Sequence, residues 1–371
     1  MSSLAMSSSK NALTTGRAPS WLPLAVGAGA LILGAALTAL VGFNLALWMV
    51  FAGLLFVIAG PVAVGMIEGR RKGTDALARY LVYAAMLLAL IPLISVVYTV
   101  LVRGVPGMSL DMLTKSMGGV TGATDNAAAS GEAPVYGGAY HAIAGTLVIT
   151  FWATIMSVPV GLLTAIYLVE YGESRLGRLL SRLITFFIDV MTGIPSIVAG
   201  LFAAALFARA FDDPGIRMGF IASVALSVLM IPVVVRNAEE MLRIVPNELR
   251  EASYALGVRK WRTIVKVVVP TAISGISSGV TLAIARVIGE TAPILVTAGF
   301  ISTINFNAFA GWMTTLPTYI YYQIMTPISP TNPQISEGRA WSAALILIII
   351  VMVLNLIARV IAKVFAPKTG R

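Results

Sequence analysis

Two charged residues stand inside a long apolar run in the C-terminal third of the chain. Arg286 and Glu290 lie within residues 271–300, four positions apart, so on one continuous helix they face the same way. A charge in hydrocarbon costs about 2.5–3.5 kcal/mol, so each must face a partner or a wet cavity. The planar fork of Arg286 suits the oxygens of an anion, with Glu290 holding the arginine when no anion is bound. A structural ion pair that packs helices together explains the two charges equally well.

Common signals of catalysis and metal binding are missing. The sequence has no GxxxxGK[ST] phosphate loop, no HExxH and no GxSxG. It has no cysteine, which excludes thiolate chemistry, and a single histidine, His141, which excludes a histidine-rich metal site. The residues therefore argue against an enzyme, and we expect no cofactor or metal in this chain.

The composition is that of a membrane protein. Of the 371 residues, 58% are hydrophobic and only 11% are charged, whereas soluble domains carry about 25% charged residues. Apolar runs of about 20 residues are long enough to cross a bilayer as helices. We therefore expect an all-α polytopic membrane protein. Eight spans are predicted, at residues 21–42, 45–67, 80–102, 140–169, 183–208, 216–235, 271–300 and 340–365.

The segments between these runs indicate orientation. Most of the 26 Lys and Arg residues fall in segments on one side of the membrane, which by the positive-inside rule places the N-terminus and the C-terminus inside. The same excess accounts for the net charge of +10 without a nucleic-acid partner. The polar residues 1–20 predict a disordered cytoplasmic tail, and 366–371 a second tail. Residues 103–139 and 301–339 are expected to be loops, the first of them flexible.

A short charged segment, residues 246–270, separates the sixth run from the seventh. Pro246 and Asn247 are typical of a helix start, with Asn247 as the expected cap, and Gly257 suits a left-handed turn after a short helix. Three apolar residues share one face of this helix: Leu249, Ala252 and Leu256. From physics alone, an interfacial helix held on anionic lipid by Trp261 remains an equal alternative.

Spaced residues in this segment resemble the EAA loop of bacterial ABC-importer permeases. At the family's spacing they are Glu251, Ala252 and Ser253, then Gly257, then Val267, Val269 and Pro270. Ser253 replaces the family's second alanine, and valines replace its isoleucine and leucine. The resemblance implies that residues 247–258 form a coupling helix that sits in a groove of a separate ATPase subunit.

Further stretches resemble the phosphate permeases of the PstA type. They are GIPSIVAGLF at 193–202, IPVVVRNAEEMLRIVP at 231–246, ARVIGETAPIL at 285–295, GAYHAIAGTLVIT at 138–150 and NLIARV at 355–360. The resemblance covers about residues 80–365 and implies the type I permease fold of ABC importers, with a six-helix core as a permease domain. The helical hairpin and basic loop at 21–79 depart from the six-span pattern as two extra N-terminal spans.

The resemblance also implies partners and a location in the bacterial cell membrane. We expect an ABC ATPase dimer that binds ATP, a second homologous permease, and an extracytoplasmic protein that binds phosphate. This chain would form half of a path for inorganic phosphate, surrounded by membrane lipid. The family's anion path includes an arginine that matches Arg236, although an arginine at the inner end of a span also serves as an ordinary membrane anchor.

Proline and glycine interrupt three of the predicted spans. We expect Gly193 with Pro195, and Gly289 with Pro293, to break helices that line a cavity, because broken helices expose N–H groups that bind anions. Pro232 is expected to be an ordinary membrane-helix proline. Asp189, near the inner end of the fifth run, is expected to pair with a cytoplasmic arginine.

Two alternatives remain open. The chain could be the sister permease of the same complex, or a permease for sulfate, molybdate or phosphonate. A different class, an ATP-independent secondary transporter or channel, would leave the EAA-like loop without a role.

Overall fold

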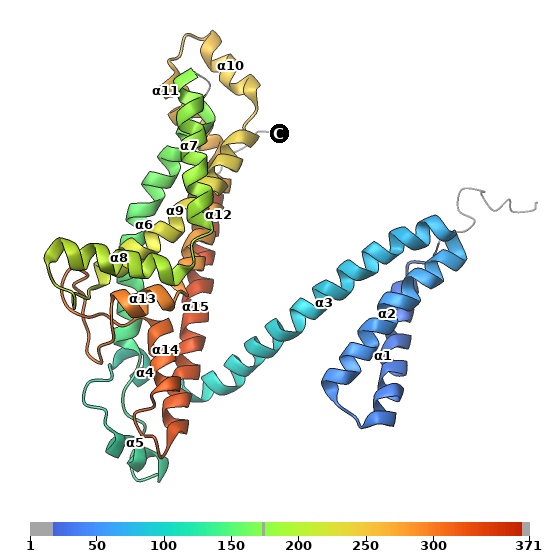
Figure 1. Cartoon of the computed structure of the whole chain (residues 1–371), viewed down its shortest axis with the longest axis horizontal. Helices are drawn as coiled ribbons and strands as arrows, with labels where there is room; N and C mark the ends of the chain where they lie inside the picture. Colours follow the sequence, from blue (N-terminus) through green and yellow to red (C-terminus); the bar gives the residue numbers. More distant parts are fainter. Residues whose placement is uncertain (1–17, 173–174, 366–371) are drawn as a thin grey trace, which may run out of the picture. The chain divides into compact units, whose positions relative to one another are not determined.

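The computed structural model describes residues 18–172 and 175–365, and all regular structure within these ranges is helical (Figure 1). The chain forms two compact units, Met1–Tyr98 and Thr99–Arg371, each described by itself below. The second unit begins at Thr99, whereas the sequence indicated a permease domain from residue 80. The tail expected at 366–371, and nearly all of the one at 1–20, lie outside the described residues.

The N-terminal unit contains the expected helical hairpin. α1 (Leu22–Val41) and α2 (Leu45–Glu68) are joined by a turn in which Gly42 has a φ of 103°. The side chain of Asn44 caps α2 by accepting a hydrogen bond from the Ala46 N–H at 2.8 Å. The hairpin is therefore built from local signals at its turn.

The prediction of a basic loop after this hairpin is wrong. Only one residue, Gly69, separates α2 from α3 (Arg70–Gly104), so the basic residues form the first turns of a continuous helix. The sharp reversal needs only Gly69, whose φ of 94° is accessible chiefly to glycine. The basic residues of this segment therefore lie at the start of a helix, and the backbone there is regular.

Four long helices form the body of the C-terminal unit and run beside one another (Figure 1). They are α6 (Tyr140–Ile166), α9 (Gly219–Ile244), α12 (Val269–Ile288) and α15 (Pro333–Phe365). α9 is the most buried of the candidate membrane spans, and Pro232 lies within it without ending it. Small residues allow close packing: a Cβ on Gly161 would lie 2.6 Å from Val234 Cγ1.

Two predicted spans are not single straight helices. The fifth is a pair, α7 (Arg175–Thr192) and α8 (Ser196–Phe211), bent by 106°. The seventh ends at Ile288, and α13 (Ala292–Thr297) follows as a separate short helix. In both places hydropathy was continuous, but proline and glycine ended the helix.

Counting the bent pair as one span, the described residues have eight candidate spans by length and composition. Six of them follow the N-terminal hairpin, as expected for a six-helix core with two extra spans.

The expectation of loops at 103–139 and 301–339 is only partly right. Short helices interrupt the irregular backbone: η1 (Val105–Gly107), α4 (Leu110–Thr114), α5 (Gly122–Ala129) and α14 (Leu316–Met325), while α15 begins at Pro333. They lie at the end of the unit opposite the segment 246–270 (Figure 1). We call η1, α4, α5 and α14 the outer cap, where outer means the end away from the segment 246–270.

A buried ion pair fastens the outer cap to α15. Arg339 Nη2 bonds to Asp125 Oδ1, and the side chains are only 3% and 1% exposed. The next residue, Asn126, accepts hydrogen bonds through Oδ1 from the side chains of Ser329, Thr331 and Asn332. These contacts join segments about 200 positions apart, so local sequence patterns do not reveal them.

We predict that Asp125→Asn loosens the outer cap. Removing one member of a buried ion pair leaves the other charge uncompensated, at a cost of about 3–5 kcal/mol. Limited proteolysis of the full chain with chymotrypsin should cleave residues 103–139 at least tenfold faster. The control is Asp111→Asn, which removes an exposed pair with Lys115 in the same segment and should have little effect. Equal cleavage rates in the two variants would show that the buried pair does not hold the cap.

Candidate functional site

The segment 246–270 forms the expected helix, sharp turn and second helix. α10 (Asn247–Ala255) is followed by Gly257 with a φ of +73°, then by α11 (Lys260–Thr263) and the π-helical turn η3 (Ile264–Val268). Pro270 lies in the first turn of α12, so the segment leads directly into that helix.

Asn247 is not the cap of α10. The residue before the helix is Pro246, with φ −61° and ψ 142°, and it has no side-chain donor or acceptor. Asn247 is the first residue of the helix, and its Oδ1 accepts a hydrogen bond from Arg250 Nη1 at 3.2 Å. The prediction failed because proline can precede a helix as well as open it.

The EAA-like residues divide between two faces of α10. Glu251 and Ala252 are exposed, as are the apolar residues Leu249 and Leu256, so they form a surface open to a partner. Ser253 is buried, and its Oγ lies 2.8 Å from Thr263 Oγ1 on α11. The serine that departs from the family pattern therefore ties the two short helices together, which alanine does not do.

A buried carboxylate holds the base of α10, and sequence analysis missed it. Glu170 lies in η2 (Tyr167–Tyr171), the π-helical turn that continues α6, and is 5% exposed. Its Oε1 accepts from Arg250 Nε at 3.0 Å, and its backbone carbonyl accepts from Lys260 Nζ. Glu170 thus joins the end of α6 to both short helices. A carboxylate directly after a long apolar run was the only sequence signal for it.

Arg250 extends this connection to α9. Its guanidinium donates to the carbonyl oxygens of Val245 at 2.6 Å and Leu242 at 3.0 Å, at the C-terminal end of α9. A cation at this position also interacts favourably with the helix dipole. The segment 246–270 is therefore anchored to the ends of α6 and α9, and it continues into α12.

Arg286 and Glu290 do not share a helix face. α12 ends at Ile288 with Gly289 as its C-cap, so Glu290 lies beyond the helix end. Within the described residues no ion pair or hydrogen bond joins their side chains, which corrects the expectation that Glu290 holds the arginine. Arg286 is exposed in the last turn of α12, where it complements the helix dipole and remains open to an anion.

Arg236 lies within α9 and is engaged by carboxylates. Its Nη2 pairs with Asp189 Oδ1 on α7, and its Nη1 lies 3.3 Å from Glu239 Oε2. Asp189 was expected to pair with a cytoplasmic arginine; the pairing with an arginine is confirmed, and its cytoplasmic side stays a prediction. An anion at Arg236 would have to compete with two carboxylates, so of the two path candidates Arg286 is the one whose guanidinium is not already paired.

The two arginines lie at different levels of the helix bundle. Asn237, the neighbour of Arg236, packs against Gly279 of α12, where an added Cβ would lie 2.5 Å from Asn237 Cβ. Arg286 is seven residues further along α12, about 10 Å at 1.5 Å per residue. Their backbone positions are therefore about two helical turns apart along the bundle.

The predicted interruptions lie at helix ends, and the short helices beyond them meet. Gly193 and Pro195 lie between α7 and α8, while Gly289 and Pro293 lie at the break before and within α13. A Cβ on Gly200 of α8 would lie 2.6 Å from Pro293 Cα, so the two backbones nearly touch. α8 and α13 lie side by side across the long helices (Figure 1). Their role in lining a path stays a prediction.

Comparison with known proteins identifies the family. Residues 157–371 match the family described as "Binding-protein-dependent transport system inner membrane component". The chain belongs to this family. The permease is 44% identical over 303 residues to "Phosphate transport system permease protein PstA 1" of Mycobacterium tuberculosis (strain CDC 1551 / Oshkosh), covering 81% of this chain and 92% of that protein. "Phosphate transport system permease protein PstA" of Yersinia pestis is 35% identical over 80% and 92% of the two chains.

Among solved structures, the permease is similar to a chain of the inward-facing MetNI methionine ABC transporter. The TM-score is 0.47 at 21% identity, over 62% of this chain and 94% of that chain. The permease is a multi-pass inner membrane component of a transport system of the PstA type.

We predict that Glu170→Gln releases the segment 246–270 of the permease. The amide keeps the shape of the side chain but leaves the largely buried Arg250 without its counter-charge. Hydrogen exchange of the α10 amides, measured by mass spectrometry on the full chain, should become at least tenfold faster. Glu251→Gln removes an exposed charge from α10 itself and should leave exchange unchanged. Unchanged exchange in both variants would mean that the Glu170 contacts do not anchor the segment.

Proposed function

We propose that this permease carries inorganic phosphate into the cell as one half of a transmembrane path, with a second, homologous permease as the other half. The observation that carries the proposal is the 44% identity to the M. tuberculosis phosphate permease, over 92% of that protein's length. The position of Arg286 supports it, because an exposed guanidinium at a break between helices can bind the oxygens of phosphate.

Transport is driven by ATP bound and hydrolysed in a separate ATPase dimer. α10 is the coupling helix, and its exposed residues Leu249, Glu251, Ala252 and Leu256 meet a groove of the ATPase. Gly257 supports this role through its left-handed backbone, which turns the chain back toward the membrane without strain. An extracytoplasmic phosphate-binding protein delivers the cargo.

The coupling helix transmits motion to Arg286 along one rigid element. From Pro270 to Arg286, α12 is uninterrupted, and sixteen residues at 1.5 Å each span about 24 Å. Displacement of the segment 246–270 by the ATPase therefore moves the arginine and the break beside it.

Both termini face the cytoplasm in this proposal. With the bent pair α7–α8 counted as one span, the number of spans is even, which returns the C-terminus to the side of the N-terminus. The excess of Lys and Arg then falls on the inner side, together with the segment 246–270.

The test is uptake of labelled phosphate by vesicles that hold the full chain with its co-purified partners. We expect uptake that requires ATP and is competed by unlabelled phosphate. Competition by sulfate, molybdate or phosphonate, with phosphate having no effect, would assign the path to another oxyanion. Uptake that continues without ATP, in preparations that contain no ATPase, would indicate a secondary transporter or channel.

We predict that Arg286→Ala abolishes phosphate uptake while the complex still assembles. The loss should exceed tenfold because the variant lacks the bidentate fork of Arg286, and Arg286→Lys should restore only part of the activity. Arg209→Ala is the matched control, because Arg209 is also exposed in the last turn of a helix, α8, and complements its dipole in the same way. Wild-type uptake by Arg286→Ala would show that Arg286 does not bind the cargo and only places a charge at the end of α12.

A further inference from the structure

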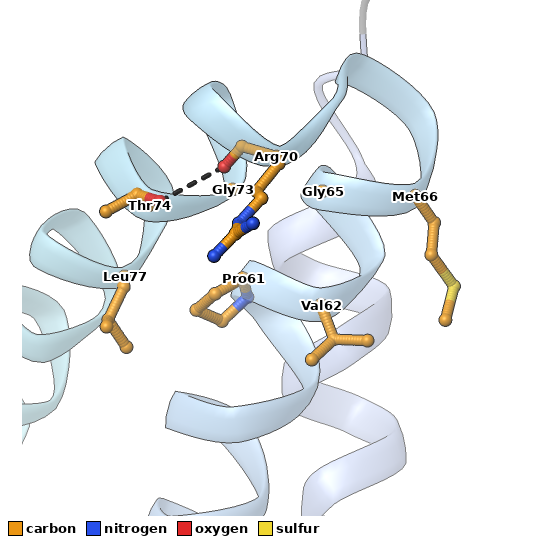
Figure 2. Close-up of a pocket in the computed structure, with 8 residues that line it drawn as sticks. All are labelled: Pro61, Val62, Gly65, Met66, Arg70, Gly73, Thr74 and Leu77. Carbon is orange, nitrogen blue, oxygen red and sulfur yellow. Dashed lines mark hydrogen bonds between the residues drawn. The ribbon is translucent and has the colours of Figure 1, made fainter.

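An open groove runs between the C-terminal half of α2 and the first turns of α3 (Figure 2). Its volume is about 420 Å³, and its walls are mostly apolar, with Val62 and Met66 from α2 and Leu77 from α3. These three side chains are all exposed. Gly65 and Gly73 bring the helices together at the groove, since a Cβ on Gly73 would lie 2.9 Å from Gly65 Cα.

One cation stands at the mouth of this groove without a counter-charge. The side chain of Arg70 lies between the two helices and points toward Pro61 (Figure 2). Within the described residues, its guanidinium has no hydrogen bond and no ion pair. Arg71, beside it, is also exposed and unpaired there, whereas Lys72 pairs with Glu68 at 3.0 Å. Asp75 and Arg79, the next charged residues on α3, have opposite signs and do not line this groove.

The charged part and the apolar part of the groove lie at different positions along the axis of α3. Arg70 opens α3 at the turn, and Leu77 lies seven residues further, about 10 Å into the apolar part of the helix. Positive charge therefore lies at the level of lipid headgroups, and apolar walls lie at the level of acyl chains. A free anion would gain nothing from these walls, while an amphipathic molecule uses both parts.

We propose that this groove binds one anionic phospholipid, with its headgroup phosphate on Arg70 and an acyl chain along Val62, Met66 and Leu77. An uncharged or zwitterionic lipid fits the walls but leaves Arg70 uncompensated. The site lies wholly within the N-terminal unit, and it does not depend on the cargo proposed for the C-terminal unit. It gives α2, one of the two extra N-terminal spans, a binding role that it shares with α3.

The test is native mass spectrometry of the purified full chain, titrated with phosphatidylglycerol and with phosphatidylcholine of the same acyl chains. We expect the first lipid to bind about fivefold more tightly, the effect of one well-placed cation near anionic lipid. Arg70→Gln should abolish this preference. Lys72→Gln removes the same charge two residues away, from a side chain that pairs with Glu68 and does not line the groove, and should keep it.

Two further arms identify the ligand class. Val62→Trp fills the groove and should weaken binding of both lipids, which distinguishes a built groove from general surface attraction. Inorganic phosphate at the lipid's concentration should not displace phosphatidylglycerol. Equal binding of the two lipids to the wild type, an unchanged preference in Arg70→Gln, or displacement by inorganic phosphate would each overturn the proposal.

Discussion

A backbone in hydrocarbon must satisfy its own hydrogen bonds, and this constraint governs where the helices of the permease break. Non-helical backbone at membrane depth is tolerated only where protein buries it or where it lines a cavity. The two breaks that follow α7 and α12 obey this rule, because the short helices beyond them, α8 and α13, pack against each other at Gly200 and Pro293. Each break supports the other, and neither would be stable facing lipid alone.

A buried ion pair lies at each end of the C-terminal unit. Glu170 pairs with Arg250 at one end, and Asp125 pairs with Arg339 at the other. A buried pair contributes modest net stability, but loss of one partner is costly, so such pairs specify one arrangement of the helices. Arg286 differs from these residues because its guanidinium remains exposed. It lies in the last turn of α12, beside the break at Gly289.

Two π-helical turns adjoin the short helices α10 and α11: η2 at the end of α6, and η3, which lies within the segment 246–270 before α12. π-turns are rare and occur often at functional sites. Here Glu170 of η2 bonds both α10 and α11, and η3 passes directly into the helix that carries Arg286. The short helices of the segment 246–270 are thus bonded to the end of α6 and continuous with α12.

The sequence by itself determined the all-helical membrane architecture, the spaced loop with its left-handed Gly257, and the helix ends at Gly193 and Gly289, because each depends on composition or on local backbone preference. Only the tertiary structure decided which charges pair. Glu170 meets Arg250 from 80 positions away, and Asp125 meets Arg339 from 214. The separation of Glu290 from Arg286 also needed the structure, since four-residue spacing brings side chains together only while the helix continues. Hydropathy and spacing report what a segment prefers, and long-range packing selects its partner.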